Sequence, residues 1–384
     1  MRILAVGGGS GGHVTPVVAV LREIRHQHPR AEMRFWCDMK FSRQAREIVS
    51  NFDNKVPVHT VMAGKFRRYH HISFVQQLLM PSIVIRNVRD IVYVVVGLIQ
   101  SITKLVIWRP GAIFFKGGYV CLPVGIAAHL LRIPYVIHDS DTHPGLTNRV
   151  LSKWATQIAT GAPIDNYPYP AEKTHYVGIP IAPEFHKFSS EERVLARKKW
   201  GIRVDRPLVV VTGGGLGAEP INNVVTGNLD VLLGLGSLVL VSGSGQYDSL
   251  RSLVPPNSDR FQLHSFIAKD MALLLGAADV VVSRAGATFI LELAAMAKPT
   301  ILIPNRKLTA GHQLKNATMY EEKGAVVVVD EVAMVSNPDL LVSAIRGLLT
   351  DRVKMSAMSD KFEGFARHGA ARDVANMVIS TARL

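Results

Sequence analysis

Cysteine is scarce in this sequence, and motifs that identify several other classes of protein are absent. Only 2 of the 384 residues are cysteine. Cys37 and Cys121 lie beside strand-like sequence, so we expect reduced core thiols in a cytosolic protein and no disulfide framework. The sequence contains no Gly-x-x-x-x-Gly-Lys-Ser/Thr loop and no Cys/His metal spacing. These absences argue against a nucleoside triphosphatase and a zinc protein.

Long uncharged runs are missing as well. The longest covers the 13 residues 91–103, whereas a membrane-spanning helix needs about 20. No apolar segment stands ahead of a cleavage site near the first residue, so we expect no signal peptide. The sequence therefore predicts a soluble or peripheral protein and not an integral membrane protein.

Acidic residues are few compared with basic ones. Lys and Arg number 44 against 30 Asp and Glu, which gives a net charge of +14. This excess favours an anionic partner: a nucleic acid, an acidic membrane surface or a phosphorylated substrate. We expect no nucleic acid, because the basic residues are spread among apolar blocks without a recognisable binding module.

Short apolar runs alternate with glycine-rich loops and helical periodicity. Residues 2–6 predict a buried strand and residues 14–25 a helix. Further strands are predicted at 112–115, 135–137, 208–211, 238–241, 280–283 and 301–303. This alternation predicts an α/β fold with parallel sheets.

The pattern starts afresh near residue 207, after a segment rich in proline and charge. We therefore predict two Rossmann-like, doubly wound domains facing each other across a cleft, where ligands bind. The first would cover residues 1–165 and the second residues 166–364. A C-terminal helix at about 365–384 would pack back on the first domain.

The first glycine-rich loop, residues 7–12, joins a predicted strand to a predicted helix. Glycines let the backbone approach a ligand, and the helix N-terminus offers N–H groups to an anion. The spacing is not Gly-x-Gly-x-x-Gly with an acid about 20 residues on, so it does not favour a nicotinamide or flavin site. His13 directly follows the loop, where a neutral imidazole could act as a base.

A second loop, residues 213–217, repeats this device and leads into Asn222. Arg284 stands at a strand end, and Glu292 follows about two helical turns later, where a carboxylate could bind a ribose diol. The alternative for Glu292 is an ordinary helix-surface charge. Three polar residues that could bind sugar hydroxyls follow a further strand: His312, Gln313 and Asn316.

Two acids, Asp139 and Asp141, follow a predicted strand in the first half. An Asp-x-Asp pair can hold Mg²⁺ or Mn²⁺ beneath a nucleotide diphosphate. No further carboxylate cluster is nearby, so we favour roles in orienting an acceptor or a base over metal binding.

Residues 65–109 combine basic side chains with apolar blocks. One interpretation is a set of core helices with a solvated basic face, since apolar stripes are usually core. The other is a basic, apolar surface that binds an anionic bilayer, which the net charge favours. The candidates for membrane contact are Phe74, Leu78, Leu79, Ile83 and Trp108.

Motifs in the same order along nearly the whole chain resemble those of the MurG family, peripheral membrane transferases of peptidoglycan synthesis. They are Gly8-Gly9-Ser10-Gly11-Gly12-His13-Val14-x-Pro16, Gly64–Tyr69, Gly117–Val120, His138-Asp139, Gly145–Asn148, Val177–Pro180, Gly213–Ala218 with Asn222, Ala278–Ala287, Glu292 and His312-Gln313-x-x-Asn316-Ala317. The family adds N-acetylglucosamine from UDP-N-acetylglucosamine to a lipid-linked muramoyl-pentapeptide, in cell-wall biogenesis, cell shape and cell division.

The resemblance implies the GT-B arrangement, inversion at the anomeric carbon and no metal or other cofactor. It places the UDP-sugar donor on the second domain. The implied donor residues are Gly214, Gly215, Asn222, Arg284, Gly286, Ala287, Glu292, His312, Gln313 and Asn316.

The acceptor, linked to a polyprenyl diphosphate, would lie on the first domain. The implied acceptor residues are Ser10, Gly11, Gly12, Tyr119, Asp141 and Asn148. His13 would be the catalytic base, with Asp139 as its helper or rival. The resemblance also implies an anionic membrane surface and cell-wall synthesis proteins as partners, and a peripheral location at the cytoplasmic face of the inner (cell) membrane.

The chain departs from the family at several positions. Asp139, Ser140 and Asp141 stand where Glu, Gln and Asn are common, and Gly215 and Leu216 replace Ser and Gln. These changes leave open a related glycolipid synthase that glycosylates diacylglycerol or another lipid. An inactive nucleotide-sugar-binding protein is the alternative of another class.

Overall fold

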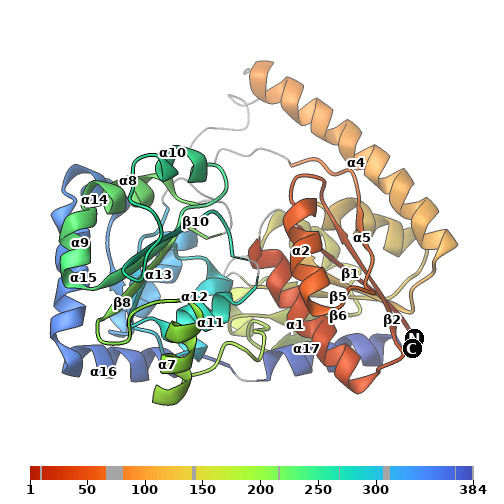
Figure 1. The fold of residues 1–384 in the computed structure, drawn as a ribbon. Coiled ribbons are helices and arrows are strands. Elements are labelled where there is room, and N and C mark those ends of the chain that lie inside the picture. The colour runs from red at the N-terminus through yellow and green to blue at the C-terminus, as the bar shows by residue number, and fades with distance from the viewer. Residues whose placement is uncertain are drawn as a thin grey trace. The chain divides into compact units, whose positions relative to one another are not determined.

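The structure, a computed structural model, describes residues 1–8, 11–65, 81–140, 144–214, 217–267, 269–305, 312–367 and 369–382. The side chains of residues 11–13, 81–84 and 312 are not among those described. The chain divides into two compact units (Figure 1). Unit 1 comprises Met1–Ala182 and Gly369–Leu384, and unit 2 comprises Pro183–His368.

Unit 1 contains a parallel sheet in the order β3-β2-β1-β4-β5-β6-β7. Its strands are β1 (Arg2–Gly7), β2 (Glu32–Cys37), β3 (Val58–Thr60), β4 (Ala112–Gly117), β5 (Tyr135–Asp139), β6 (Gln157–Thr160) and β7 (Thr174–Tyr176). Because β7 pairs with β6, unit 1 extends beyond residue 165.

The described helices of unit 1 cover both faces of this sheet. They are α1 (Gly11–Gln27), α2 (Ser42–Phe52), α4 (Pro81–Ile107), α5 (Cys121–Leu130), α6 (Leu146–Leu151) and α17 (Ala370–Thr381), with short 3₁₀ turns at Ile164–Asn166 and Ala171–Lys173. Successive residues of β1 point to opposite faces: Ile3 packs in one apolar cluster with α1 and α17, and Leu4 packs in the other with α5. Burial on both faces explains why β1 is a continuous apolar run.

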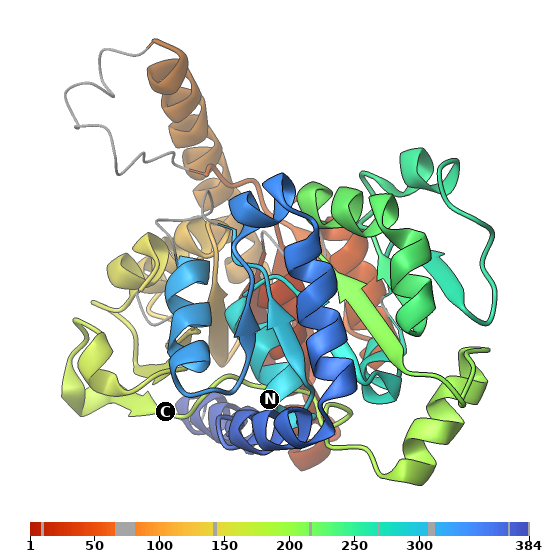
Figure 2. The ribbon, with the colours of Figure 1, turned by 90° about the vertical axis from the view of Figure 1, so that its left-hand side faces the viewer.

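Unit 2 contains a second parallel sheet, in the order β10-β9-β8-β11-β12-β13. Its strands are β8 (Leu208–Thr212), β9 (Ser237–Val241), β10 (Phe261–His264), β11 (Val280–Ser283), β12 (Thr300–Leu302) and β13 (Val327–Val328). Its described helices are α7 (Ser190–Lys199), α8 (Glu219–Gly227), α9 (Leu229–Leu235), α10 (Tyr247–Arg251), α11 (Met271–Ala277), α12 (Ala287–Ala295), α13 (His312–Glu322), α14 (Glu331–Ser336), α15 (Asp339–Thr350) and α16 (Arg352–Glu363). Figure 2 shows unit 2 with strands between layers of helices.

Two parallel, doubly wound sheets confirm the predicted fold class. The predicted strands agree with the observed ones to within two residues at each end. The predicted helix at about 365–384 corresponds to the shorter helix α17. α16 ends at Glu363, and Gly369, with a φ of +91°, precedes α17, which packs against α1.

The long helix α4 lies against α5 on the outside of unit 1 (Figures 1 and 2). Of the described helices it is the one long and apolar enough to cross a membrane, judged by length and composition, and its most apolar window is 22% buried. The uncharged run of residues 91–103 is shorter than this helix, because the charged residues Asp90 and Lys104 that bound the run are themselves part of α4.

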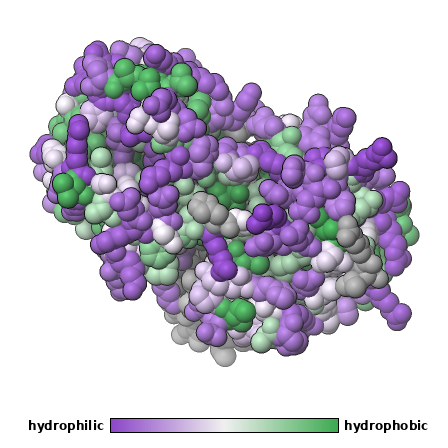
Figure 3. Space-filling view, turned by 90° about the horizontal axis from the view of Figure 1, so that it is seen from below, coloured by the Kyte–Doolittle hydropathy of each residue, from purple (hydrophilic) through white to green (hydrophobic). Residues whose placement is uncertain are grey.

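α4 packs Leu98, Ile102 and Leu105 against the core of unit 1 and leaves other apolar residues exposed. Asp90 and Ser101 are buried, and a Cβ on Gly97 would overlap the carbonyl oxygen of Met62. The exposed large apolar side chains of α4 are Ile85, Val88, Ile91, Val92, Val95, Ile99, Val106 and Ile107. By contrast, the face in Figure 3 shows apolar side chains mainly in small separate areas.

Trp108 does not belong to this exposed face, which corrects its assignment to a membrane surface. Its side chain is 6% exposed, and its Nε1 donates to Glu32 Oε2 at 3.4 Å. The Arg34 guanidinium lies 4.2 Å from the ring centroid. Of the other four candidates, Phe74, Leu78 and Leu79 lie outside the described residues, and so does the side chain of Ile83.

Candidate functional site

The carboxyl edge of the first sheet brings together loops that the sequence predicted for a ligand. β1 and β4 are neighbours, and the strand order turns around between them, where doubly wound sheets bind ligands. β1 leads through Gly8 toward α1, and β4 leads through Gly118 to Tyr119. A Cβ on Gly118 would lie 2.6 Å from the carbonyl oxygen of Gly8, so the two loops pack backbone against backbone.

The predicted residues Gly11, Gly12 and His13 form the first turn of α1. Their N–H groups lie at the helix end that stabilises an anion. The side chain of His13 is not among those that the structure describes, and Ser10 and Asp141 lie outside the described residues.

Asp139, the last residue of β5, is enclosed rather than open. Its side chain is 5% exposed, and its Oδ2 accepts a hydrogen bond of 2.7 Å from the Tyr169 hydroxyl. Tyr169 stacks on Tyr167, with ring centroids 5.5 Å apart. Burial and then the Asp139 carboxylate raise the pKa of Tyr169, so the phenol stays protonated and donates. The arrangement suits an acid that positions a neighbour better than one that takes up a proton.

Asn148, predicted for the acceptor, is 4% exposed and binds the protein itself. Its Nδ2 donates to the His138 carbonyl oxygen at 3.2 Å, and its Oδ1 is buried without a hydrogen-bond partner. The ring of His138 bonds through Nε2 to the Gly178 carbonyl oxygen at 2.8 Å. Burial, and then the charge of Lys116, hold the pKa of His138 well below its usual range. His138 is therefore a neutral structural imidazole.

Two charged residues at this edge were not predicted from the sequence as site residues. Lys116, 2% exposed, donates from Nζ to the Ser140 hydroxyl. Asp38, also 2% exposed, follows β2 and accepts a hydrogen bond from the hydroxyl of Tyr119. Lys116 is the penultimate residue of β4, directly before Gly117 and Gly118, whereas Asp38 follows β2, which was not predicted.

The carboxyl edge of the second sheet carries the predicted donor residues. Its strand order turns around between β8 and β11. The loop after β8 turns tightly, because the Gly217 N–H donates to the Gly214 carbonyl oxygen at 2.9 Å. Gly214 has a φ of +80°, which favours glycine there. The predicted residue Gly215 lies outside the described chain.

Asn222, on α8, ties this loop region to the next strand. It is fully buried, and its Nδ2 donates to the Ser242 carbonyl oxygen at 2.9 Å and to Gln246 Oε1. Its Oδ1 is buried without a hydrogen-bond partner. Asn222 therefore binds α8 to the segment that follows β9.

The helix α12 starts where β11 ends, with Gly286 as its N-cap and Ala287 as its first residue. No side chain caps this end, and its first turn contains no acid. Glycine at this position supplies no side-chain cap, as at helix ends that bind a phosphate.

Arg284 lies beside this helix end but is engaged in an ion pair. It is 9% exposed, its Nη1 donates to the Ile303 carbonyl oxygen at 3.1 Å, and it pairs with Glu331 at the start of α14. The sequence predicted a role at a diphosphate and did not foresee the carboxylate partner.

The remaining predicted donor residues lie on α12 and α13. Glu292 is 6% exposed and Asn316 is 7% exposed. Gln313 Oε1 accepts a hydrogen bond of 2.9 Å from the Asn305 N–H, just after β12. The His312 side chain lies outside the described part. Gly214, Arg284 and Gln313 are thus gathered at the ends of β8, β11 and β12.

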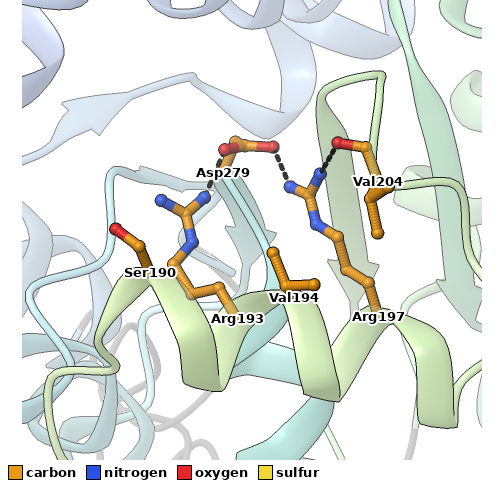
Figure 4. A pocket seen from close by; sticks show the side chains of 6 residues that line it. All are labelled: Ser190, Arg193, Val194, Arg197, Val204 and Asp279. Carbon is orange, nitrogen blue, oxygen red and sulfur yellow. Dashed lines mark hydrogen bonds and ion pairs between the residues drawn. The ribbon is translucent and has the colours of Figure 1, made fainter.

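A cavity of about 210 Å³ lies at the other edge of this sheet (Figure 4). Asp279, directly before β11, binds Arg193 and Arg197 of α7 and accepts a hydrogen bond of 2.7 Å from the Leu208 N–H. The Arg197 guanidinium also donates to backbone carbonyl oxygens. These contacts fasten α7 to the sheet, away from the predicted donor loops.

Within the described residues no group of three or more His, Cys, Asp or Glu is arranged to hold a metal ion. Cys37 and Cys121 are free and buried, and burial raises the pKa of each to about 12. Neither thiol is a candidate nucleophile.

Comparisons with known proteins match both units. Residues 3–160 match the glycosyltransferase family 28 N-terminal domain, and residues 208–374 match the family 28 C-terminal domain. A protein of Clostridium kluyveri is 32% identical over 94% of this chain and 96% of its own length. One of Acetivibrio thermocellus is 34% identical over 94% of this chain and 92% of its own length. Both are named UDP-N-acetylglucosamine--N-acetylmuramyl-(pentapeptide) pyrophosphoryl-undecaprenol N-acetylglucosamine transferase.

Solved structures show the same fold. MurG of Acinetobacter baumannii superposes with a TM-score of 0.67 at 21% identity, covering 99% of each chain. The calicheamicin glycosyltransferase CalG4 superposes with a TM-score of 0.63 at 14% identity, covering 99% of this chain and 98% of its own.

Proposed function

The chain belongs to glycosyltransferase family 28, and on this premise we propose that it transfers N-acetylglucosamine from UDP-N-acetylglucosamine to N-acetylmuramyl-(pentapeptide) pyrophosphoryl-undecaprenol. The observation that carries the proposal is the extent of the similarity. Relatives that share one name are 30–34% identical over 94–99% of the chain, so they cover both units and both predicted loop edges.

The donor binds at the carboxyl edge of the second sheet. The first turn of α12 and the loop after β8 offer backbone N–H groups to the diphosphate, and Arg284 adds a positive charge. Glu292 takes the ribose, and the residues at the start of α13 take the sugar. The Arg284–Glu331 ion pair holds the guanidinium beside this helix end.

The acceptor binds at the carboxyl edge of the first sheet. His13 removes the proton from the acceptor hydroxyl while the oxygen of that hydroxyl forms a bond to the anomeric carbon. The bond from that carbon to the diphosphate breaks, and UDP leaves as an anion that the N–H groups of unit 2 stabilise. The attack inverts the anomeric carbon. Asp139, held by Tyr169, positions the acceptor side.

The reaction needs no metal in this proposal. Backbone N–H groups and Arg284 carry the charge of the leaving diphosphate, a task that Mg²⁺ performs in other transferases. A chelator should therefore leave the rate unchanged.

α4 places the protein on the membrane that holds the acceptor. Apart from Arg86, Arg89 and Thr103, its exposed side chains are Ile and Val, which are stabilised by burial in hydrocarbon. Arg86 and Arg89, both exposed, lie toward its N-terminal end, where they can meet anionic headgroups. We assign to this face a peripheral, cytoplasmic-side membrane contact.

A transfer assay tests the proposal. Purified protein is given labelled UDP-N-acetylglucosamine and vesicles with the muramoyl lipid, with and without chelator. We expect labelled lipid in both cases. Binding of the donor without any lipid product would indicate an inactive sugar-nucleotide-binding protein, and loss of product with chelator would return Asp139 and Asp141 to consideration as metal ligands.

A further inference from the structure

Asp38 lies where three loops of unit 1 meet. It directly follows β2, whereas Gly8 follows β1 and Tyr119 follows β4. The three strands are neighbours in the order β2-β1-β4. The turnaround of the strand order, where we place the acceptor, adjoins this residue.

The carboxylate of Asp38 is saturated with protein contacts. Its Oδ1 accepts hydrogen bonds from the N–H groups of Lys40, at 3.0 Å, and Phe41, at 3.1 Å, which fixes the turn into α2. The hydroxyl of Tyr119 donates to the same carboxylate. Burial of the phenol, and then the Asp38 charge, raise the pKa of Tyr119, so this donor stays protonated.

The first glycine loop packs closely against the side chain of Asp38. A Cβ on Gly8 would lie 2.5 Å from Asp38 Oδ2, and one on Gly118, whose φ is +89°, would lie 2.6 Å from the Gly8 carbonyl oxygen. A shift of the carboxylate therefore moves both the loop that leads to His13 and the loop that carries Tyr119.

We propose that Asp38 is a positioning residue of the acceptor side, which acts through Tyr119 and the loop at Gly8. Asp38 is 2% exposed, too enclosed to reach a ligand itself, whereas Tyr119 is half-buried. The inference rests on the proposed function in one respect, which is that the acceptor binds at the carboxyl edge of the first sheet.

A double-mutant cycle distinguishes this positioning role from a role only in shaping the turn into α2. Asp38→Asn keeps one oxygen, which can still accept from the N–H groups of Lys40 and Phe41, and removes the negative charge that accepts from Tyr119. Tyr119→Phe removes only the hydroxyl. If one contact carries both effects, each variant lowers kcat/KM for the acceptor about tenfold, and the double variant also lowers it about tenfold instead of about a hundredfold. The KM for UDP-N-acetylglucosamine stays unchanged.

Asp53→Asn is the matched control. Asp53 follows the other end of α2 and forms a similar turn, in which its Oδ1 accepts from the Lys55 N–H at 2.9 Å. Unlike Asp38, it forms an ion pair with Arg25 of α1. We expect full transfer activity in this variant. A multiplicative loss in the double variant, or an Asp38→Asn effect no larger than that of Asp53→Asn, would overturn the inference.

The cycle uses whichever acceptor the wild-type protein glycosylates, so a different acceptor would defeat the proposed function and leave this test intact. Amide hydrogen exchange of residues 7–12, without substrates, supplies a readout independent of activity. Exchange should accelerate equally in Asp38→Asn, Tyr119→Phe and the double variant. Unchanged exchange in all three would overturn the inference even in a protein without transferase activity.

Discussion

The hydroxyl of Tyr169 donates a 2.7 Å hydrogen bond to Asp139, and both side chains are almost fully buried. A carboxylate in this position is a poor base, since a hydrogen bond from the buried Tyr169 hydroxyl stabilises its charged form. We therefore predict that Asp139→Asn and Tyr169→Phe each lower kcat by about tenfold, the range of one hydrogen bond to a charged group. Steady-state kinetics with saturating donor measure this.

The opposite assignment gives a different pattern. If Asp139 were the base, Asp139→Asn would lower kcat by about a hundredfold or more, and Tyr169→Phe would have little effect. Equal, moderate losses in the two variants support positioning.

His13 is the predicted base, at the first turn of α1. His13→Gln should lower kcat by about 10²–10⁴-fold, since it removes general base catalysis, while leaving donor binding intact. His26→Gln, at the exposed end of the same helix, is the control and should transfer normally. Activity of His13→Gln near the wild-type rate would remove His13 from the mechanism.

Arg284, after β11, contacts the Ile303 carbonyl oxygen and Glu331 of α14. Arg284→Ala leaves the Glu331 carboxylate and the Ile303 carbonyl oxygen without this donor, so we predict a loss of about 1–3 kcal/mol in the free energy of unfolding and slower transfer. Urea unfolding and kinetics measure the two effects.

Glu331→Gln separates them, because it keeps an oxygen acceptor while leaving Arg284 free to bind the diphosphate. We expect Glu331→Gln to transfer at close to the wild-type rate. If it loses as much activity as Arg284→Ala, Arg284 acts only through the ion pair.

The sequence predicted both sheets because apolar runs followed by glycines recur in each half. It missed β2, where Glu32 and Arg34 interrupt the apolar pattern, and with it Asp38. It could not show that Tyr169, 30 residues from Asp139, would enclose that acid. Composition identified the apolar block of α4, but tertiary packing, such as that of Gly97 against Met62, shows which face points outward. Contacts between distant segments, unlike local patterns, are set by tertiary packing.

Lys298 makes the stability of unit 2 depend on pH. It is 5% exposed, and its Nζ donates to the carbonyl oxygens of Gly276 and Ala278 at 2.6 and 3.0 Å. Burial, and then the charge of Arg193, lower its pKa from 10.5 to about 7. Between these values the unfolded chain holds a proton that the folded chain lacks, so the free energy of unfolding rises with pH, by at most about 1.4 kcal/mol per pH unit.

Urea unfolding across this pH range should show a steeper rise for the wild type than for Lys298→Met. Lys323→Met, at an exposed position of the same unit, should keep the wild-type slope. Identical slopes for the wild type and Lys298→Met would contradict the assignment.

The outward face of α4 should bind lipid. Ile99 is 60% exposed, and burying such a side chain in hydrocarbon is worth about 1.5–3 kcal/mol. Ile99→Asp should therefore weaken co-sedimentation with anionic vesicles at least about tenfold. Val353→Asp, at an 81% exposed position on α16 of unit 2, should bind like the wild type. Equal binding of Ile99→Asp and the wild type would exclude α4 as the contact.

The acceptor is tested most directly by competition within one vesicle. Muramoyl-pentapeptide pyrophosphoryl-undecaprenol and diacylglycerol are mixed in equal amounts, labelled UDP-N-acetylglucosamine is added with the protein, and the labelled lipids are separated. We predict that nearly all of the label enters the muramoyl lipid. Label found chiefly in diacylglycerol would contradict the proposed function and identify a glycolipid synthase.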